Sequence, residues 1–123
     1  MTTDATPDMC TTADVFETLK YNVIAKNGGQ YYFNADNQLH RDEGPAVITA
    51  SGAMFWCQYG ERHRVGGPAA IYSTGSRVWY QNGKLHRTDG PACVWAHGVV
   101  QWYLDGVELD EHEFKLKVKT YHA

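Results

Sequence analysis

The sequence predicts a mainly β protein, in which tandem antiparallel β-hairpin repeats form an elongated twisted sheet with short helices at the N- and C-terminal ends. The pattern His-Arg-x-x-Gly-Pro-Ala occurs three times, at 40–46, 63–69 and 86–92, so its period is 23 residues. Aromatic residues make up 13% of the 123 residues and glycine contributes 12, a composition that suits short strands joined by tight turns. A period of this length is typical of stacked units that bury a core together.

The 23-residue period divides the chain into units with atypical ends. We expect three full units and a partial fourth, at 29–51, 52–74, 75–97 and 98–109. The fourth unit keeps Gly98 and Trp102 but has Leu109-Asp110 in place of His-Arg, as the terminal units of repeat arrays often do. The outer segments are expected to be a disordered tail, an N-terminal helix and strand, and a C-terminal helix, at 1–12, 13–28 and 110–123 respectively.

Each unit is expected to contain two short strands. The first strands are predicted at 31–34, 54–58, 77–81 and 100–104, and the second strands at 46–50, 69–73 and 92–96. Asn82-Gly83 and Asp105-Gly106 are turn signals, because glycine adopts positive φ readily and Asn or Asp tolerates it. Proline cannot donate to a strand ladder, so the Gly-Pro step suits the start of each second strand.

The two end segments carry helix signals. Thr12 is placed to cap a helix over 13–20, which a strand over 21–26 follows. Asp110 and Glu113 resemble a capping box, and three apolar residues follow at helical spacing: Phe114, Val118 and Tyr121. A strand with outward-facing lysines is the alternative for this last segment, and the helix is preferred.

Alternation along each strand assigns side chains to the two faces of the sheet. One face is expected to carry a tryptophan ladder of Trp56, Trp79 and Trp102, whose sequence register Phe33 shares. The expected core lies beneath this ladder, where the second strands contribute small and branched residues: Ala46, Ile48, Ala69, Ile71, Ala92 and Val94. The other face carries the best candidates for a binding surface, since Tyr and Trp are favoured as interface anchors: Tyr72, Tyr80, Trp95 and Tyr103.

Composition and charge weigh against several classes of function. The formal net charge is −3, the pI is about 6.0 and no run of Lys or Arg occurs, so nucleic-acid binding is not expected. No apolar run reaches the ~20 residues that a membrane helix requires, so a membrane role is disfavoured and would be peripheral. The cysteines are odd in number, Cys10, Cys57 and Cys93, and form no Cys-x-x-Cys pair, which favours a reduced, cytoplasmic setting.

The repeated pattern places two ladders of polar side chains along the sheet. Equivalent residues of successive units should lie about 9–10 Å apart, twice the strand spacing, so His40, His63 and His86 cannot share one metal ion. We expect each histidine to hydrogen-bond its own turn or to pack on a neighbouring tryptophan, so histidines and tryptophans alike have a structural role. Arg41, Arg64 and Arg87 form the second ladder and are expected to pair with acidic neighbours or stack on aromatic rings, with an anion-binding rail as the alternative. No catalytic constellation is recognised, so we expect no enzyme activity, no metal and no cofactor.

Trp79-Tyr80-Gln81-Asn82-Gly83-Lys84-Leu85-His86 resembles the central step of MORN repeats, which are β-hairpins of the same length. Gly60-Glu61-Arg62-His63 and Trp102-Tyr103-Leu104-Asp105-Gly106 match in part, and the resemblance covers about 29–109. The Arg-x-x-Gly-Pro-Ala after each His departs from the common MORN pattern and is similar to repeats of bacteriophage and giant-virus proteins. The resemblance implies a hairpin sheet with an interaction role and no reaction.

Together these observations predict a non-catalytic protein-binding module. If the chain is phage-encoded, its expected partner is a bacterial host factor that it inhibits or modulates in the host cytoplasm, and a homodimer is a further expectation. Two alternatives stay open. One is a peripheral lipid-binding module of MORN type, with Lys115, Lys117 and Lys119 as its basic cluster. The other is a nucleotide- or ligand-sequestering protein with the arginine ladder as its lining.

Overall fold

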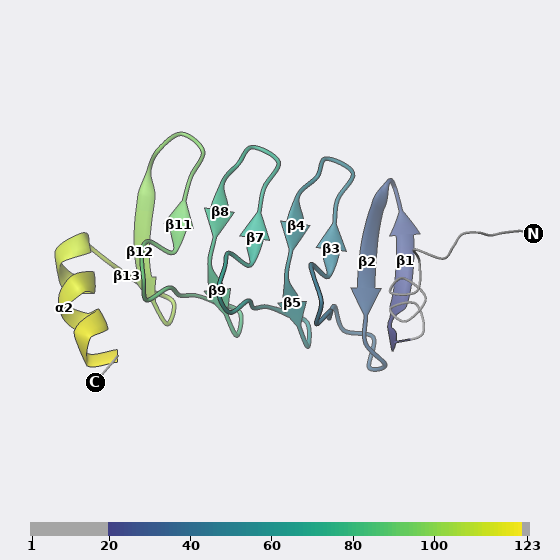
Figure 1. Cartoon of the computed structure of the whole chain (residues 1–123), viewed down its shortest axis with the longest axis horizontal. Coiled ribbons are helices and arrows are strands. Elements are labelled where there is room, and N and C mark those ends of the chain that lie inside the picture. Colours follow the sequence, from purple (N-terminus) through teal and green to yellow (C-terminus); the bar gives the residue numbers. More distant parts are fainter. Residues whose placement is uncertain (1–19, 122–123) are drawn as a thin grey trace, which may run out of the picture.

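The computed structural model describes residues 20–121, which form a nine-stranded antiparallel sheet, two two-stranded sheets and one C-terminal helix. The mainly β prediction and the C-terminal helix are therefore confirmed. The strands of the large sheet are, in spatial order, β1 (Asn22–Lys26), β2 (Gly29–Phe33), β3 (Val47–Ile48), β4 (Met54–Phe55), β7 (Ala70–Ile71), β8 (Arg77–Val78), β11 (Cys93–Val94), β12 (Val100–Leu104) and β13 (Val107–Leu109). Figure 1 shows these strands in one row, with helix α2 (Glu111–Tyr121) at the end opposite β1.

The small sheets lie along one margin of the large sheet. They are β5 (Cys57–Gln58) with β6 (Glu61–Arg62), and β9 (Tyr80–Gln81) with β10 (Lys84–Leu85). The first strands predicted at 54–58 and 77–81 are each divided in two, because the chain leaves the large sheet at Trp56 or Trp79 and pairs in a small sheet beyond it. Strands β6, β10 and β13 were not predicted.

The first unit is one residue longer than the sequence register assumed. The N–H of Trp56 and of Trp79 donates to the carbonyl of the next buried alanine, and in the first unit the equivalent donor is Tyr32, not Phe33. The extra residue lies in the turn after Asn34, whose side-chain Oδ1 accepts hydrogen bonds from two backbone N–H groups of that turn. The sequence register that equates Phe33 with the tryptophans is therefore wrong by one residue.

The core is divided between the two faces. Ala46, Ala69 and Ala92 are fully buried, as predicted, but Ile48, Ile71 and Val94 are only half-buried. The main cluster lies on the opposite face and consists of Ala70, Val78 and Cys93. The residues next to the predicted alanines thus supply the larger core, because the tryptophan side is covered by arginines and loops rather than by a packed apolar layer.

Helix α2 closes the end of the sheet. Its capping box forms as predicted: the Glu113 N–H donates to Asp110 Oδ1 at 2.8 Å, and the Asp110 N–H donates to Glu113 Oε1 at 3.3 Å. Phe114 is buried, and its ring lies 4.8 Å from that of Trp102 between centroids. The tail expected over 1–12 and the helix expected over 13–20 fall, apart from Lys20, outside the described residues, whereas the strand expected after them is present as β1.

Candidate functional site

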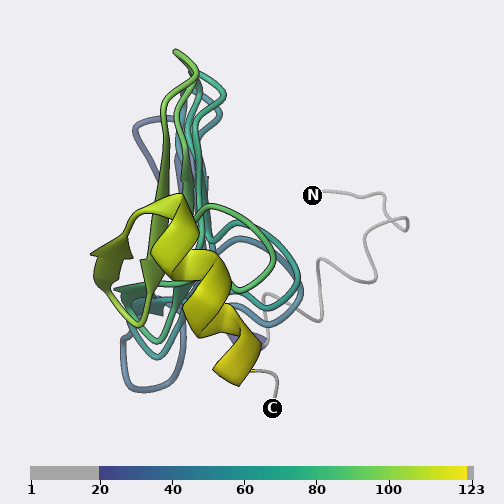
Figure 2. The same cartoon turned by 90° about the vertical axis from the view of Figure 1, so that its left-hand side faces the viewer.

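The three arginines of the repeated pattern stack on aromatic rings. The Cζ atoms of Arg64 and Arg87 lie 3.9 and 3.8 Å from the ring centroids of Trp56 and Trp79, and Arg41 lies 3.9 Å from that of Tyr32. In each case Nη1 also donates to a proline carbonyl four residues on, at 3.2, 3.0 and 3.0 Å for Pro45, Pro68 and Pro91. The loops that carry these residues protrude on one side of the sheet in Figure 2.

The glycine of the repeated pattern makes room for the arginine. A Cβ atom on Gly67 or Gly90 would lie 2.9 or 2.8 Å from the guanidinium carbon of Arg64 or Arg87, and one on Gly44 would lie 3.3 Å from that of Arg41. The missing side chain, rather than an unusual backbone angle, explains why glycine stands here. The glycine thus leaves room for the arginine side chain, which in turn donates to the proline carbonyl.

Each of the three histidines holds a turn further along the chain, and not its own turn as expected. Nδ1 of His40, His63 and His86 accepts a hydrogen bond from a backbone N–H 19 residues later, at 3.0, 3.0 and 2.9 Å. Each donor belongs to a turn whose two central residues have positive φ: Tyr59-Gly60, Asn82-Gly83 and Asp105-Gly106. The lone pair of each Nδ1 is therefore used in holding the next turn. Within residues 20–121, no group of three or more His, Cys, Asp or Glu side chains could hold a metal ion.

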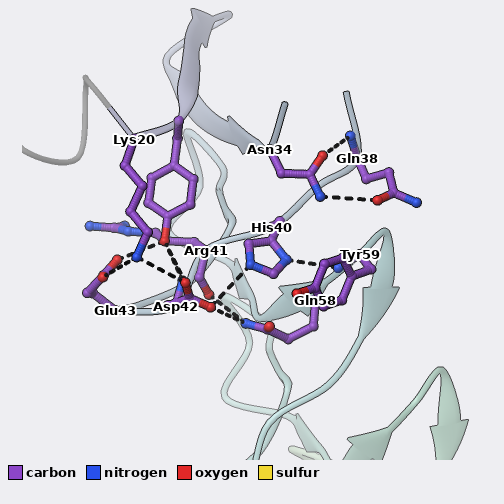
Figure 3. Close-up of polar contacts among 10 residues, drawn as sticks. Lys20, Asn34, Gln38, His40, Arg41, Asp42, Glu43, Gln58 and Tyr59 are labelled. Atoms are coloured by element: carbon purple, nitrogen blue, oxygen red, sulfur yellow. Dashed lines mark hydrogen bonds and ion pairs between the residues drawn. The ribbon is translucent and has the colours of Figure 1, made fainter. Parts of the chain in front are cut away.

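Lys20 lies beside Asp42 and Glu43, the two residues that follow Arg41, as Figure 3 shows. Tyr21 is buried against the ring of Tyr32, and its hydroxyl accepts the Asp42 N–H at 2.8 Å. Nζ of Lys20 lies 3.1 Å from carboxylate oxygens of both Asp42 and Glu43. Hydrogen bonding to Lys20 lowers the pKa of both carboxyl groups below the ordinary range, and burial raises the pKa of Tyr21.

The candidate binding residues Tyr72, Tyr80, Trp95 and Tyr103 lie together on the face opposite the arginines. With Phe55 they pack against the buried cluster of Ala70, Val78 and Cys93. We call these five half-buried side chains the aromatic face: Phe55, Tyr72, Tyr80, Trp95 and Tyr103. A cleft of about 730 Å³ opens on it, lined among others by Tyr31, Phe55 and Tyr80. Arg62 lies over two of its rings, with Cζ 4.5 Å from the Phe55 centroid and 5.6 Å from the Tyr80 centroid.

The arginine side contains a second cleft, which sequence reasoning did not find. It has a volume of about 560 Å³ and lies between the first two arginine stacks, where Arg64 and Trp56 form part of its wall. Tyr59 and Val65 also line it and are 67% and 78% exposed. The signal available in the sequence was their departure from the repeat, since the following unit has Asn82 and Thr88 at these positions.

The described cysteines are buried thiols. Cys57 and Cys93 are 4% and 2% exposed and form no disulfide. Burial raises the pKa of Cys57, and it raises the pKa of Cys93 to about 11. Both thiols are therefore protonated and shielded at neutral pH, which suits packing rather than nucleophilic chemistry.

Comparison of the chain with protein-family models, curated proteins and solved structures finds no match. Within residues 20–121, no helix is long enough and apolar enough to cross a membrane; α2 has 11 residues.

Proposed function

We propose that this chain is a non-catalytic protein-binding module, built from MORN-like hairpin units, and that the aromatic face is its binding surface. The single observation that carries the proposal is the placement of five half-buried aromatic side chains on one sheet face beside a cleft of about 730 Å³. Clustered Tyr and Trp side chains supply most of the binding energy at many protein interfaces.

The tandem arrangement of units is supported by hydrogen bonds that recur at 23-residue intervals. The Trp56 N–H donates to the Ala69 carbonyl and the Trp79 N–H to the Ala92 carbonyl, both at 2.7 Å. Such stacking would repeat aromatic side chains along the face and produce an extended rather than a point-like contact surface.

The two sides of the sheet differ in how they are covered. The tryptophan side is covered by the stacked arginines and by Phe114 of α2. The aromatic face is covered less: Arg62 lies over the Phe55 and Tyr80 rings, and all five rings stay partly exposed. A partner could therefore reach it without displacing an element of the fold.

The polar groups of the repeated pattern support binding rather than catalysis. Each histidine uses its Nδ1 lone pair to accept a backbone N–H. Each arginine is stacked and donates to a proline carbonyl. Residues committed to the fold in this way are poorly placed to transfer protons or bind a reacting group.

The proposal is tested by affinity capture from a bacterial lysate, which the resemblance to phage repeats makes the first source to try. The tagged full chain is compared with the variant Tyr72→Ala/Trp95→Ala/Tyr103→Ala, and recovered proteins are identified by mass spectrometry. We expect one protein to be recovered in stoichiometric amount with the wild type and to be lost with the variant.

Matched controls separate a lost surface from a lost fold. Leu116→Ala removes a 54% exposed apolar side chain from α2, outside both clefts, and should leave capture unchanged. Tyr31→Arg, which changes the cleft without removing a side chain of the buried cluster, should reduce capture even if the triple variant unfolds. Recovery of the same protein by Tyr31→Arg and by the folded triple variant would exclude the aromatic face as the binding surface.

A further inference from the structure

The second unit departs from its neighbours at two places that line the same cleft. After the histidine and arginine, the first and third units have Asp42-Glu43 and Thr88-Asp89, whereas the second has Val65-Gly66. At the turn, the third and fourth units have Asn82 and Asp105 at positive φ, whereas the second has Tyr59. Tyr59 and Val65 both line the cleft of about 560 Å³ on the arginine side.

Arg64 is held in this cleft with part of its guanidinium unpaired. Its plane stacks on Trp56, and Nη1 donates to the Pro68 carbonyl at 3.0 Å. Within residues 20–121 the structure gives the guanidinium group of Arg64 no other hydrogen-bond or ion-pair partner. Its Nε and Nη2 donors are therefore available on an arginine whose position is already fixed.

The third unit shows what the same arginine position binds when an acid is near. The Nε of Arg87 donates to Asp89 Oδ1 at 2.9 Å, and this hydrogen bond lowers the pKa of the Asp89 carboxyl group. Arg87 is stacked on Trp79 and bonded to Pro91 as Arg64 is to its own partners. A carboxylate from this chain thus occupies at Arg87 the position that is open at Arg64.

The surroundings of Arg64 favour an acidic side chain of a protein as the occupant. The carboxylates of Asp42 and Glu43 also line the cleft, but Lys20 binds both of them at 3.1 Å. The exposed side chains of Tyr59 and Val65 offer apolar contact to the stem of an incoming residue. Tyr59 holds φ at 50°, a conformation that costs a bulky residue on the order of 1–2 kcal/mol relative to an extended one.

We propose that Arg64 is the anchor of a carboxylate-binding site, which takes an Asp or Glu side chain from a protein partner. This inference rests on the proposed function in assigning the carboxylate to a protein. A singly charged carboxylate matches the one open edge of the guanidinium, as in the Arg87–Asp89 pair. One Lys20 ammonium faces the two carboxylates of Asp42 and Glu43, so negative charge remains nearby, and it repels a doubly charged phosphate more than a singly charged carboxylate.

Heteronuclear NMR of the arginine Nε–Hε groups of the full chain tests the site. The probe is the amide of N-acetylglutamate, which carries one side-chain carboxylate, and the amide of N-acetylglutamine is its uncharged match. We expect a saturable shift of the Arg64 resonance with the glutamate probe, in the millimolar range, and no such shift with the glutamine probe. The backbone amide of Val65 serves as a second reporter, and in Arg64→Gln its response should weaken on the order of tenfold.

A gain-of-function variant provides the matched control. Asp89 is 82% exposed, so Asp89→Asn should preserve the fold and free the Nε of Arg87. We expect Arg87 to respond to the glutamate probe in this variant and not in the wild type. Equal responses of Arg64 and Arg87 in the wild type, or tighter binding of inorganic phosphate than of the glutamate probe at Arg64, would overturn the inference.

Capture experiments distinguish this inference from the proposed function. Loss of the captured protein in Arg64→Gln supports both. Capture that the aromatic-face variant abolishes and Arg64→Gln leaves unchanged overturns the partner carboxylate while the proposed function stands. A glutamate response at Arg64 without any captured protein supports the carboxylate site and contradicts the proposed function.

Discussion

Replacing Gly90 with alanine should destabilise the protein by displacing Arg87. The new Cβ would lie 2.8 Å from Cζ and 3.0 Å from Nη1 of Arg87, closer than atoms pack. The φ angle of Gly90 is not in the left-handed region, so alanine can adopt the local backbone conformation. The guanidinium is the mobile end of a long side chain, so it should move while the backbone stays.

The expected cost follows from the contacts that Arg87 would lose. Its stacking on Trp79 is worth about 1 kcal/mol at a partly exposed site. Its hydrogen bond to the Pro91 carbonyl has a charged donor and contributes roughly 1.5 kcal/mol. The alanine restricts the unfolded chain and returns about 0.4–1 kcal/mol. The net loss in free energy of unfolding is therefore about 1.5–2 kcal/mol.

A double-mutant cycle measured by urea unfolding tests this account. In the Arg87→Ala background the clash is absent, so Gly90→Ala should be neutral or stabilise by about 0.4–1 kcal/mol. Gly90→Ala should thus change sign between the two backgrounds. An equal loss in both would refute the reasoning, because it would show that the glycine is needed for the backbone and not for the arginine.

Three further predictions concern other parts of the fold. His63→Ala removes the acceptor of the exposed Asn82 N–H and should cost about 0.5–1.5 kcal/mol, with faster hydrogen exchange at that amide; unchanged exchange would contradict the contact. Phe114→Ala should cost about 3–5 kcal/mol, reduce the helical circular dichroism signal and shift Trp102 emission to the red, whereas Leu116→Ala, at a 54% exposed position, should do none of these. Because the pKa of Cys93 is raised to about 11, its alkylation in the folded chain should stay slow up to about pH 9, where an ordinary thiol is largely ionised, and should become fast on unfolding. Rapid alkylation of the folded chain would show that the thiol is exposed.

Features with a strict local cause were predictable from the sequence. The turns at Asn82-Gly83 and Asp105-Gly106 have the expected positive φ values, and the Asp110–Glu113 capping box starts α2 where it was placed. These elements depend on the conformational preferences of a few neighbouring residues. Such preferences can be read without knowing the tertiary structure.

Features that depend on packing between units were not predictable in the same way. The division of the 54–58 strand at Trp56 follows from a change of pairing partner, which the local sequence does not encode. The equivalence of Tyr32 with the tryptophans required the strand register, because the extra residue lies in the turn after Asn34. The core on the aromatic face was missed because alternation alone cannot say which of two apolar faces is covered.

The candidate site was predictable in part. Alternation placed Tyr72, Tyr80, Trp95 and Tyr103 on one side, and the structure gathers them around the buried Val78. The cleft beside Arg64 was not predicted, since the ladder interpretation treated the three arginines as equivalent. The contacts in the structure distinguish Arg64 from Arg87. Arg87 binds the Asp89 carboxylate, and Arg64 binds no carboxylate of the described residues.

Site-specific photo-crosslinking tests the proposed protein-binding surface most directly. A benzophenone amino acid is placed at Tyr72, on the aromatic face, and in a second variant at Val107, a 59% exposed position on β13. Both variants are irradiated in bacterial lysate. The proposed function predicts that position 72 crosslinks to one protein, and that position 107 does not crosslink to that protein. The same adducts from both positions, or an adduct from position 107 alone, would contradict binding through the aromatic face.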